Sequence, residues 1–257
     1  MRDLNKQYGT SKNLETRISI YEKALNPESL QSWVARKIPA RSGIKILELG
    51  CGNGLLWKDL APSFTGCEIT LSDMSKGMLD KARQAEGTKN CRFEVIDYHD
   101  IPYGDEKFDT VISNHNLYHA SDLPKVLSEI SRVLKKGGDF FATTNSSSHL
   151  LRLKDLLGLE KEEYWPNSNL TDRFGAENAS PLLAEYFDKV DLSYYENELM
   201  VEDFSLIMNY FFSLQAPNIH EIARARKEEM EEVFQEEYQR TGYFSISTRA
   251  CLFSCIK

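Results

Sequence analysis

The stretch Ile46 to Gly54 constrains the fold more than any other part of the chain, because it joins a strand pattern to glycines at alternate positions. The residues before the first glycine, Lys45 to Leu49, form a mostly apolar run that is typical of a short buried strand. Leucines then recur at helical spacing, which predicts a helix directly after the last glycine. The glycines therefore lie at a strand-to-helix turn, where missing Cβ atoms let a ligand reach the backbone and positive φ angles are allowed. The residues at this turn are Gly50, Gly52 and Gly54.

The spacing of these glycines separates two kinds of nucleotide site. A dinucleotide-binding fingerprint has the spacing G-x-G-x-x-G, which would place its third glycine at position 55. That position is Leu55, and the third glycine, Gly54, comes one residue early. Pyrophosphate binding is therefore disfavoured, and a tight turn with a purely structural role stays an alternative for this loop taken alone.

Predicted strands and helices alternate from Lys45 onward, which indicates right-handed βαβ units and a doubly wound, mostly parallel sheet of the α/β class. We expect Gly137 and Gly138 to stop the helix that precedes the fifth strand. The predicted strands cover residues 45–50, 68–73, 91–97 and 108–114 and a segment through Phe140 to Ala142, and the predicted helices cover residues 54–62, 75–85 and 122–135.

We expect one decorated domain over residues 1–257, because no repeat or low-complexity linker divides the chain. Residues 1–42 are predicted to form a helical cap, which either covers one face of the sheet or acts as a lid that brings Tyr8, Arg17 and Tyr21 to a ligand. Residues 43–144 are the predicted ligand-binding core. Residues 145–240 are predicted to hold insertions, with a strand over 190–201 and helices near 202–214 and 219–240, and residues 241–257 are predicted to form the last strand.

Charge and cysteine content exclude several classes of protein. The net charge of −8 argues against a general nucleic-acid or anionic-membrane partner, which would require a basic surface. No apolar run approaches the roughly 20 residues of a membrane span, and the N-terminus lacks the apolar segment of a signal peptide, so we expect a soluble cytoplasmic protein. The five cysteines form no C-x-x-C pair and have no histidines at metal-ligand spacing, which predicts reduced thiols and no bound metal.

A carboxylate follows the glycine turn at the separation expected of a nucleoside site. Asp73 ends the second predicted strand and lies 73 − 50 = 23 residues after the first glycine. A carboxylate at this place can accept hydrogen bonds from both hydroxyls of a ribose. The next residue, Met74, can pack against the face of an adenine ring, or equally well at the start of the following helix.

The segment Glu48 to Gly54 resembles motif I, E/D-x-G-x-G-x-G, of the class I S-adenosylmethionine-dependent methyltransferases. The acidic position that follows motif I in this family is matched by Asp73. Two later family motifs, D-x-x-x-L/I-P and F-D-x-V, are matched in the same order by the segments Asp97 to Pro102 and Phe108 to Val111. Tyr118-His119 and Val133 to Gly138 are similar to the small-molecule subgroup that includes quinone-biosynthesis C-methyltransferases. The resemblance covers residues 45–144, and beyond them extends only to the general architecture.

This resemblance implies a seven-stranded sheet whose last strand runs antiparallel between the fifth and the sixth. It implies the cofactor S-adenosyl-L-methionine, with S-adenosyl-L-homocysteine as product. Asp97 would lie near the exocyclic amine of adenine, with a turn or capping role as its alternative, and the Tyr98 backbone amide would contact an adenine ring nitrogen. Asn114 would meet the methionyl ammonium. The expected cofactor-binding residues are Glu48, Gly50, Cys51, Gly52, Gly54, Asp73, Met74, Asp97, Tyr98 and Asn114.

Methyl transfer is an in-line displacement at a sulfonium carbon, so much of its rate comes from holding donor and acceptor in line. A general base is needed only where the acceptor must lose a proton. His115 and His119 follow the fourth predicted strand and are the candidates for a catalytic base. Each could instead orient the acceptor or bond to backbone carbonyls.

We expect the acceptor to be a small molecule, aromatic or hydrophobic, bound by a monomer or homodimer. An RNA or protein methyltransferase is the first alternative, which the acidity of the chain disfavours. A non-catalytic module that binds the cofactor or its product is the second. The residues expected to contact the acceptor are Tyr8, Tyr118, Tyr164 and Trp165.

Overall fold

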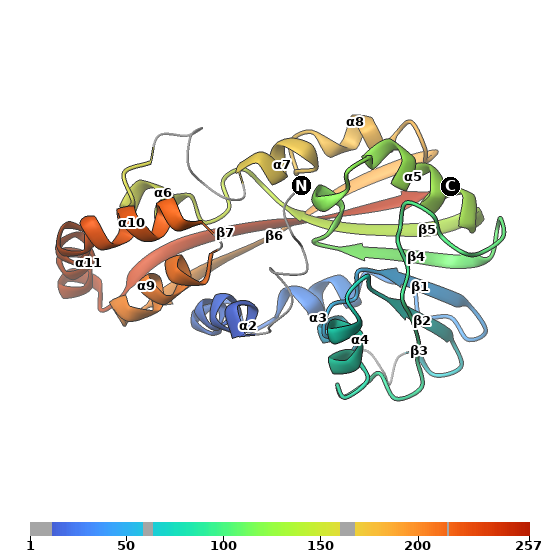
Figure 1. The fold of residues 1–257 in the computed structure, drawn as a ribbon, viewed down its shortest axis with the longest axis horizontal. Coiled ribbons are helices and arrows are strands. Elements are labelled where there is room, and N and C mark those ends of the chain that lie inside the picture. The colour runs from blue at the N-terminus through green and yellow to red at the C-terminus, as the bar shows by residue number, and fades with distance from the viewer. Residues whose placement is uncertain (1–11, 59–63, 160–167, 215) are drawn as a thin grey trace. The chain divides into compact units, whose positions relative to one another are not determined.

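The computed structural model describes residues 12–58, 64–159, 168–214 and 216–257 (Figure 1). The chain divides into two compact units. The first comprises Met1–Pro27, Ser146–Asp172 and Glu196–Arg249, and the second comprises Glu28–Asn145, Arg173–Tyr195 and Ala250–Lys257. Organisation as a single domain stays a prediction.

A seven-stranded sheet confirms the predicted fold class. Its strand order is β3-β2-β1-β4-β5-β7-β6. Strands β1 to β5 pair in parallel, whereas β7 pairs antiparallel with β5, so the last strand lies between the fifth and the sixth as the resemblance implied. The strands are β1 (Lys45–Leu49), β2 (Glu68–Ser72), β3 (Arg92–Glu94), β4 (Phe108–Asn114), β5 (Leu134–Asn145), β6 (Lys189–Val201) and β7 (Phe244–Ile256).

The central strands of the second unit are apolar on both faces. On β1, Leu47 belongs to one buried cluster and Ile46 to another, and Val111 and Ile112 of β4 separate in the same way. Successive side chains of a strand point to opposite faces, so each strand supplies both clusters. A sheet covered on both faces needs such near-continuous apolar runs, which is why β1 and β4 could be recognised from the sequence.

Helix α5 (Leu123–Val133) begins where the sequence predicts. Asp122 precedes it, and the Asp122 side chain accepts the Lys125 N–H at 3.1 Å. Pro124 occupies the first turn, where its missing N–H costs no hydrogen bond. One face of the helix buries an apolar stripe in the core of the second unit.

The prediction that Gly137 and Gly138 stop helix α5 was wrong. The helix ends at Val133, and Leu134 is already the first residue of β5. Leu134 is fully buried, has an extended backbone and pairs with Phe108, so the chain enters the sheet directly. The two glycines lie within β5, where its pairing with β4 shifts register.

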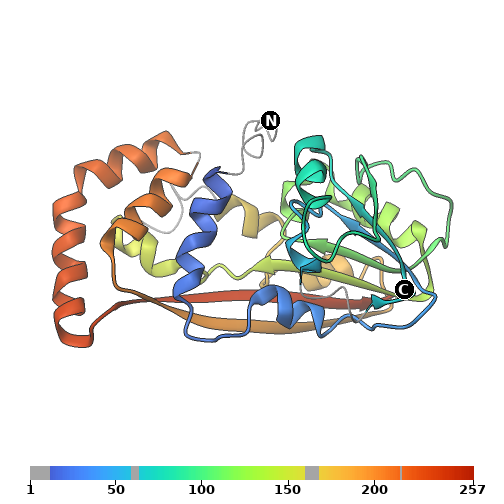
Figure 2. The ribbon, with the colours of Figure 1, turned by 90° about the horizontal axis from the view of Figure 1, so that it is seen from below.

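The first unit contains a group of helices around an apolar core, in which α9 contacts both α2 and α10 (Figure 2). The helix predicted over 219–240 is two helices, α10 (Pro217–Ala225) and α11 (Lys227–Thr241). They break at Arg226, whose backbone leaves the helical region. The break lets each helix bury its own apolar residues, Ile219 and Ala223 in α10 and Met230 and Phe234 in α11.

The predicted helix over 54–62 begins as a short 3₁₀ turn, η2 (Leu55–Trp57), and its residues 59–62 lie outside the described part.

No helix in the described ranges combines the length and the apolar character needed to cross a membrane. The other helices are α2 (Lys12–Ser19), η1 (Ile20–Lys23), α3 (Leu30–Ala35), α4 (Lys76–Ala82), η4 (Leu117–His119), α6 (Leu151–Leu156), α7 (Ser168–Arg173), α8 (Ala179–Leu183) and α9 (Phe204–Ser213).

Candidate nucleoside-binding site

The glycine turn after β1 has a backbone that other residues rarely adopt. The φ angles of Gly50, Gly52 and Gly54 are +72°, +56° and +78°. A Cβ on Gly50 would collide with the side-chain amide of Asn116, whereas a Cβ on Gly52 would meet no described atom within 4 Å. Gly50 is therefore required by packing as well as by its backbone, while the backbone at Gly52 is open to the approach of another molecule.

Asp73 fastens this turn to the end of β2. Its Oδ2 accepts the Gly52 N–H at 3.0 Å, and its Oδ1 accepts the Ser75 N–H at 2.8 Å. Each carboxylate oxygen can accept a further hydrogen bond, and the side chain is partly exposed, so Asp73 is able to hold two hydroxyls. Burial raises the pKa of Asp73, and the two backbone hydrogen bonds oppose that rise.

Glu48, on β1 just before the turn, is a buried carboxyl with only 2% of its surface exposed. Its Oε2 accepts the Trp57 indole N–H at 2.6 Å, and its Oε1 accepts the Asn114 side-chain amide at 3.0 Å. Burial raises the pKa of Glu48 to about 7, although both hydrogen bonds favour the charged form. A cation held near this carboxyl would therefore make it give up its proton near neutral pH.

Asn114 links β1, β4 and β5 through its side chain. The amide donates to Glu48, and Oδ1 accepts the Thr143 hydroxyl at 3.1 Å, so the side chain is held from two directions. Trp57 and Thr143 were not among the predicted site residues. Nothing in the sequence singles them out, because they act on Glu48 and Asn114 from 9 and 29 residues away.

Asp97 lies in the loop after β3 and is bonded to His99. Asp97 Oδ1 accepts the His99 backbone N–H at 2.9 Å and lies 2.7 Å from ring Nδ1. Burial opposes ionisation of Asp97, but the hydrogen bonds and positive charge around it outweigh burial and leave its pKa below the ordinary value. Tyr98 packs against the core, and its ring stacks on His99 with centroids 4.9 Å apart.

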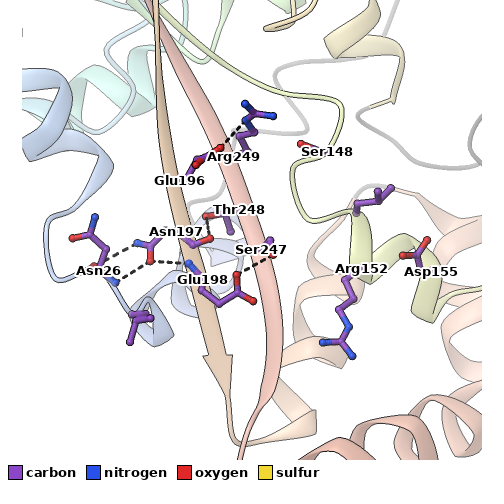
Figure 3. A pocket seen from close by; sticks show the side chains of 12 residues that line it. Asn26, Ser148, Arg152, Asp155, Glu196, Asn197, Glu198, Ser247, Thr248 and Arg249 are labelled. Carbon is purple, nitrogen blue, oxygen red and sulfur yellow. Dashed lines mark hydrogen bonds and ion pairs between the residues drawn. The ribbon is translucent and has the colours of Figure 1, made fainter.

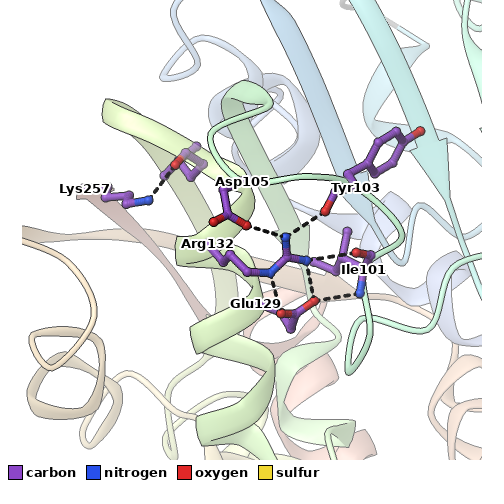
Figure 4. A network of polar contacts seen from close by, with 7 residues as sticks. Ile101, Tyr103, Asp105, Glu129, Arg132 and Lys257 are labelled. Carbon is purple, nitrogen blue, oxygen red and sulfur yellow. Dashed lines mark hydrogen bonds and ion pairs between the residues drawn. The ribbon is translucent and has the colours of Figure 1, made fainter.

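The same loop is clamped by two side chains of α5, Glu129 and Arg132 (Figure 4). Arg132 donates to the carbonyls of Ile101 and Tyr103 at 3.0 and 2.7 Å and to Asp105 at 3.0 Å. It also makes a bidentate pair with Glu129 at 2.7 and 2.8 Å, so all five guanidinium N–H groups are used. Glu129 in turn accepts the Ile101 N–H at 2.9 Å. The backbone that follows Asp97 is thus fixed to a buried helix.

His115 follows β4 with a positive φ of 49°, which few residues other than glycine adopt. Its N–H bonds both the carbonyl and the hydroxyl oxygen of Thr143, each at 3.1 Å. Burial lowers the pKa of His115 to about 4, so its ring is neutral at physiological pH. Such a ring is a weak base near pH 7 and serves better as an uncharged hydrogen-bonding group.

The remaining predicted residues have varied places. Cys51 is buried and donates its N–H to Ser72, so its backbone forms part of the turn, and burial raises the pKa of its thiol. Met74 is 56% exposed beside Asp73. Tyr118 and His119 lie together in the short turn η4 after β4. Tyr8, Tyr164 and Trp165 lie outside the described residues.

A hollow of about 830 Å³ lies in the first unit, between β6, β7 and α6 (Figure 3). Most of its charged groups already have partners: Arg249 Nε lies 3.0 Å from Glu196, and Ser247 donates to Glu198 at 2.9 Å. Arg152 is held by Glu237 and by the Ser245 carbonyl. None of the predicted site residues within the described ranges lines this hollow, so we place no function there.

A family model described as "Methyltransferase domain" matches residues 40–237. A malonyl-[acyl-carrier protein] O-methyltransferase of Bacillus anthracis is 30% identical over 135 residues, which make up 52% of this chain and 50% of the relative. The chain therefore spans about half the length of that relative. Nothing in these matches singles out the quinone-biosynthesis subgroup, which stays a prediction.

Two solved structures share the fold of this chain. Phosphoethanolamine N-methyltransferase 2 of Haemonchus contortus, in complex with S-adenosyl-L-methionine, aligns with a TM-score of 0.59 at 16% identity. The alignment covers 99% of this chain and 59% of that one. A SAM-dependent methyltransferase of Aquifex aeolicus aligns with a TM-score of 0.52 at 16% identity, over 71% of this chain and 89% of that one.

Proposed function

Because the chain belongs to the class I S-adenosylmethionine-dependent methyltransferase family, we propose that it transfers a methyl group from S-adenosyl-L-methionine to a small-molecule acceptor. One observation carries the proposal for this chain: Asp73 bonds the N–H of Gly52 and still has lone pairs for a ligand. A ribose-binding carboxylate and an open glycine backbone thus lie next to each other, as a nucleoside site requires.

The proposed donor site follows the carboxyl ends of β1 to β4, where ligands of open α/β sheets bind. Asp73 accepts the ribose hydroxyls, and Met74 covers one face of the adenine. Asp97 and the Tyr98 N–H bond the edge of the base. Glu48 and Asn114 hold the methionyl end, with Gly50, Cys51, Gly52 and Gly54 providing the backbone around it.

The donor supplies an electrophilic methyl on a positively charged sulfur. The task of the protein is then to align the acceptor with this methyl and to keep both in place. In this proposal His115 is an uncharged hydrogen-bonding group beside the acceptor. His119 is the remaining candidate for a base where the acceptor must lose a proton.

A small acceptor is supported by the acidity of the chain, whose net charge of −8 suits neither RNA nor an anionic surface. The names of the relatives above specify acceptors as different as malonyl-[acyl-carrier protein] and phosphoethanolamine, so the fold alone does not define the acceptor. We propose an aromatic or hydrophobic acceptor beside Tyr118, bound by a monomer or homodimer.

Titration calorimetry with S-adenosyl-L-homocysteine tests the donor site. Asp73→Ala should weaken binding by about 1–3 kcal/mol, the scale of a hydrogen bond that involves a charged group. Asp80→Ala is the matched control, because Asp80 is an exposed carboxylate that pairs with Arg83 on α4. Equal affinity of wild type and Asp73→Ala would refute the ribose assignment, and no binding by wild type would refute the proposed function.

Transfer of a labelled methyl group tests the acceptor class. Label should appear in a small-molecule extract and not in total RNA or protein from the same cells. Label in RNA or protein would favour the corresponding alternative. Binding of the donor without transfer to any of the three fractions would favour a non-catalytic module.

A further inference from the structure

The ring of His99 lies between Asp97 and the start of helix α5. Nδ1 is 2.7 Å from Asp97 Oδ1, and Nε2 is 3.0 Å from the Ser121 hydroxyl and 3.4 Å from the backbone nitrogen of Asp122. A backbone N–H can only donate, so Nε2 must carry the lone pair. The proton of the neutral ring is therefore on Nδ1 and is donated to Asp97.

Both hydrogen bonds from His99 end on the same oxygen of Asp97. The backbone N–H and ring Nδ1–H both reach Oδ1, which fixes the rotation of the carboxylate. No described residue donates to Oδ2, and half of the Asp97 side chain, 50%, is exposed. Oδ2 is therefore an oriented acceptor that faces away from His99 and is open to a ligand.

The other end of the His99 contact is rigid. Ser121 and Asp122 precede α5, whose apolar face is buried in the core of the second unit. The Glu129–Arg132 pair of α5 bonds the backbone on the far side of His99, at Ile101 and Tyr103, and Arg132 also bonds the Asp105 side chain. Because its ring bonds both the start of α5 and Asp97, His99 holds the Asp97 side chain in one orientation. A ligand then loses less free energy in immobilising that side chain.

The order Ser121, His99, Asp97 also resembles the hydrogen-bonded triad of a hydrolase. Such an enzyme needs backbone N–H groups that converge on an oxyanion. At the start of α5 the Asp122 N–H is used by His99, Pro124 has no N–H, and the Lys125 N–H is used by Asp122. Of the N–H groups of residues 122–125 this leaves only that of Leu123, so the first turn of α5 offers no pair of donors for an oxyanion, and the triad does not support hydrolysis.

We propose that His99 is a positioning residue that orients Asp97 to accept the 6-amino group of adenine, and so makes the donor site selective for adenine. This inference rests on the proposed function, because it needs the nucleoside at the carboxyl end of β3. A fixed carboxylate attracts the 6-amino group of adenine, which donates, and repels the 6-oxo group of hypoxanthine, which accepts.

The test compares S-adenosyl-L-homocysteine with S-inosyl-L-homocysteine, which has a 6-oxo group and a proton on N1 where the adenine ligand has a 6-amino group and a lone pair. Calorimetry should give wild type a preference of roughly tenfold to a hundredfold for the adenine ligand. Asp97→Asn should reduce that preference, because an amide can donate to the 6-oxo group, and only the part that arises from the Tyr98 N–H and ring N1 should remain. His99→Ala should reduce it roughly threefold to tenfold, because the adenine ligand must then immobilise a carboxylate that is free to rotate.

Two conservative variants separate positioning from general loosening of the loop. His99→Asn keeps an N–H donor near the place of Nδ1 and should retain most of the preference. His99→Gln places its amide near Nε2 and should lose it. A merely structural role for His99 would weaken both ligands equally and leave their affinity ratio unchanged, which would overturn the proposal.

A measurement on wild type covers the case in which variants do not fold. Nitrogen-15 NMR of the imidazole should show the proton of His99 on Nδ1, and the opposite tautomer would overturn the proposal. Wild type that binds neither ligand would refute the proposed function itself. Wild type that binds the adenine ligand while His99→Ala and His99→Gln keep the full preference would refute only the role of His99.

Discussion

The buried carboxyl of Glu48 should make the stability of the protein depend on pH in a way that Glu48→Gln removes. The pKa of Glu48 is raised from 4.5 to about 7 in the folded protein. At 1.36 kcal/mol per pKa unit, this rise in pKa corresponds to about 3 kcal/mol of the free energy of unfolding. Because the folded pKa is raised, the contribution is fully present below pH 4.5 and is lost as pH rises through 7.

His115 acts in the opposite direction, so the difference between two proteins is the quantity to measure. The pKa of His115 is lowered from 6.5 to about 4, so its contribution to stability grows over that range as pH rises. Both proteins contain His115 and Asp73, whose effects cancel in the difference. The glutamine amide also faces two N–H donors, from Trp57 and Asn114, which lowers stability by an amount independent of pH.

Urea denaturation of wild type and Glu48→Gln between pH 5 and 8, followed by tryptophan fluorescence, gives this difference. The free energy of unfolding of wild type minus that of the variant should fall by about 2–3 kcal/mol over this range. If this difference in unfolding free energy stays constant within about 0.5 kcal/mol, Glu48 ionises as readily in the folded as in the unfolded chain, and its pKa is not raised by folding.

The glycine turn, the Arg132 clamp and His115 each give a further prediction. Gly52→Ala should lower the free energy of unfolding by about 1–2 kcal/mol, because φ is positive at this position. It should also lower the affinity for S-adenosyl-L-homocysteine at least roughly tenfold in calorimetry, because the added methyl group would block access to the backbone. Gly137→Ala, at a φ of +69° and where the added Cβ would meet no described atom within 4 Å, should have the same stability cost and keep the affinity. Equal losses of affinity for the two variants would contradict the role of Gly52. Arg132→Lys should lower the free energy of unfolding by about 2–4 kcal/mol in urea, since lysine cannot replace five directed N–H groups. The control Arg36→Lys, at an exposed ion pair with Glu28, should lower the free energy of unfolding by less than about 0.5 kcal/mol. A similar cost for Arg132→Lys and Arg36→Lys would show that the Arg132 contacts do not stabilise the loop. His115→Asn should slow methyl transfer without changing the shape of its rate profile between pH 6 and 8, because the ring is neutral throughout; loss of a rising limb would identify His115 as the titrating base.

Local patterns were sufficient to predict the strands and the glycine turn. Strands β1 and β4 are buried on both faces, so their residues are mostly apolar in spite of polar residues such as Glu48 and Asp109. Their predicted bounds, 45–50 and 108–114, match the observed ones to within one residue. The φ angles of Gly50, Gly52 and Gly54 follow from a motif in which only glycine fits. The position of Asp73 at the end of β2 could be predicted because the strand before it is equally recognisable from its apolar residues.

Element ends that depend on tertiary contacts could not be predicted. The glycines at 137 and 138 would stop an isolated helix, but burial of Leu134 ends α5 sooner. The break at Arg226 is hidden because the apolar spacing of α10 continues into α11 in sequence. Asp109 of the F-D-x-V motif proves structural, since it bonds the Lys45 N–H at 2.8 Å and Lys135 Nζ at 2.6 Å.

Side chains that support the site escaped prediction for a related reason. Trp57, His99 and Arg132 act by bonding other residues of the site rather than by facing a ligand. Their partners lie close in space and are defined by packing, which a single sequence does not specify. The residues proposed to contact the ligand recur at a characteristic spacing in the sequence. The residues that orient those side chains have no such spacing.

The donor site is best tested by a crystal structure of the protein with S-adenosyl-L-homocysteine. Both ribose hydroxyls should lie within hydrogen-bonding distance of Asp73, the adenine amine should lie at Asp97 Oδ2, and the amino end of the ligand should lie beside Glu48 and Asn114. Density for the ligand at any other place, with the glycine turn and Asp73 uncontacted, would contradict the proposed donor site.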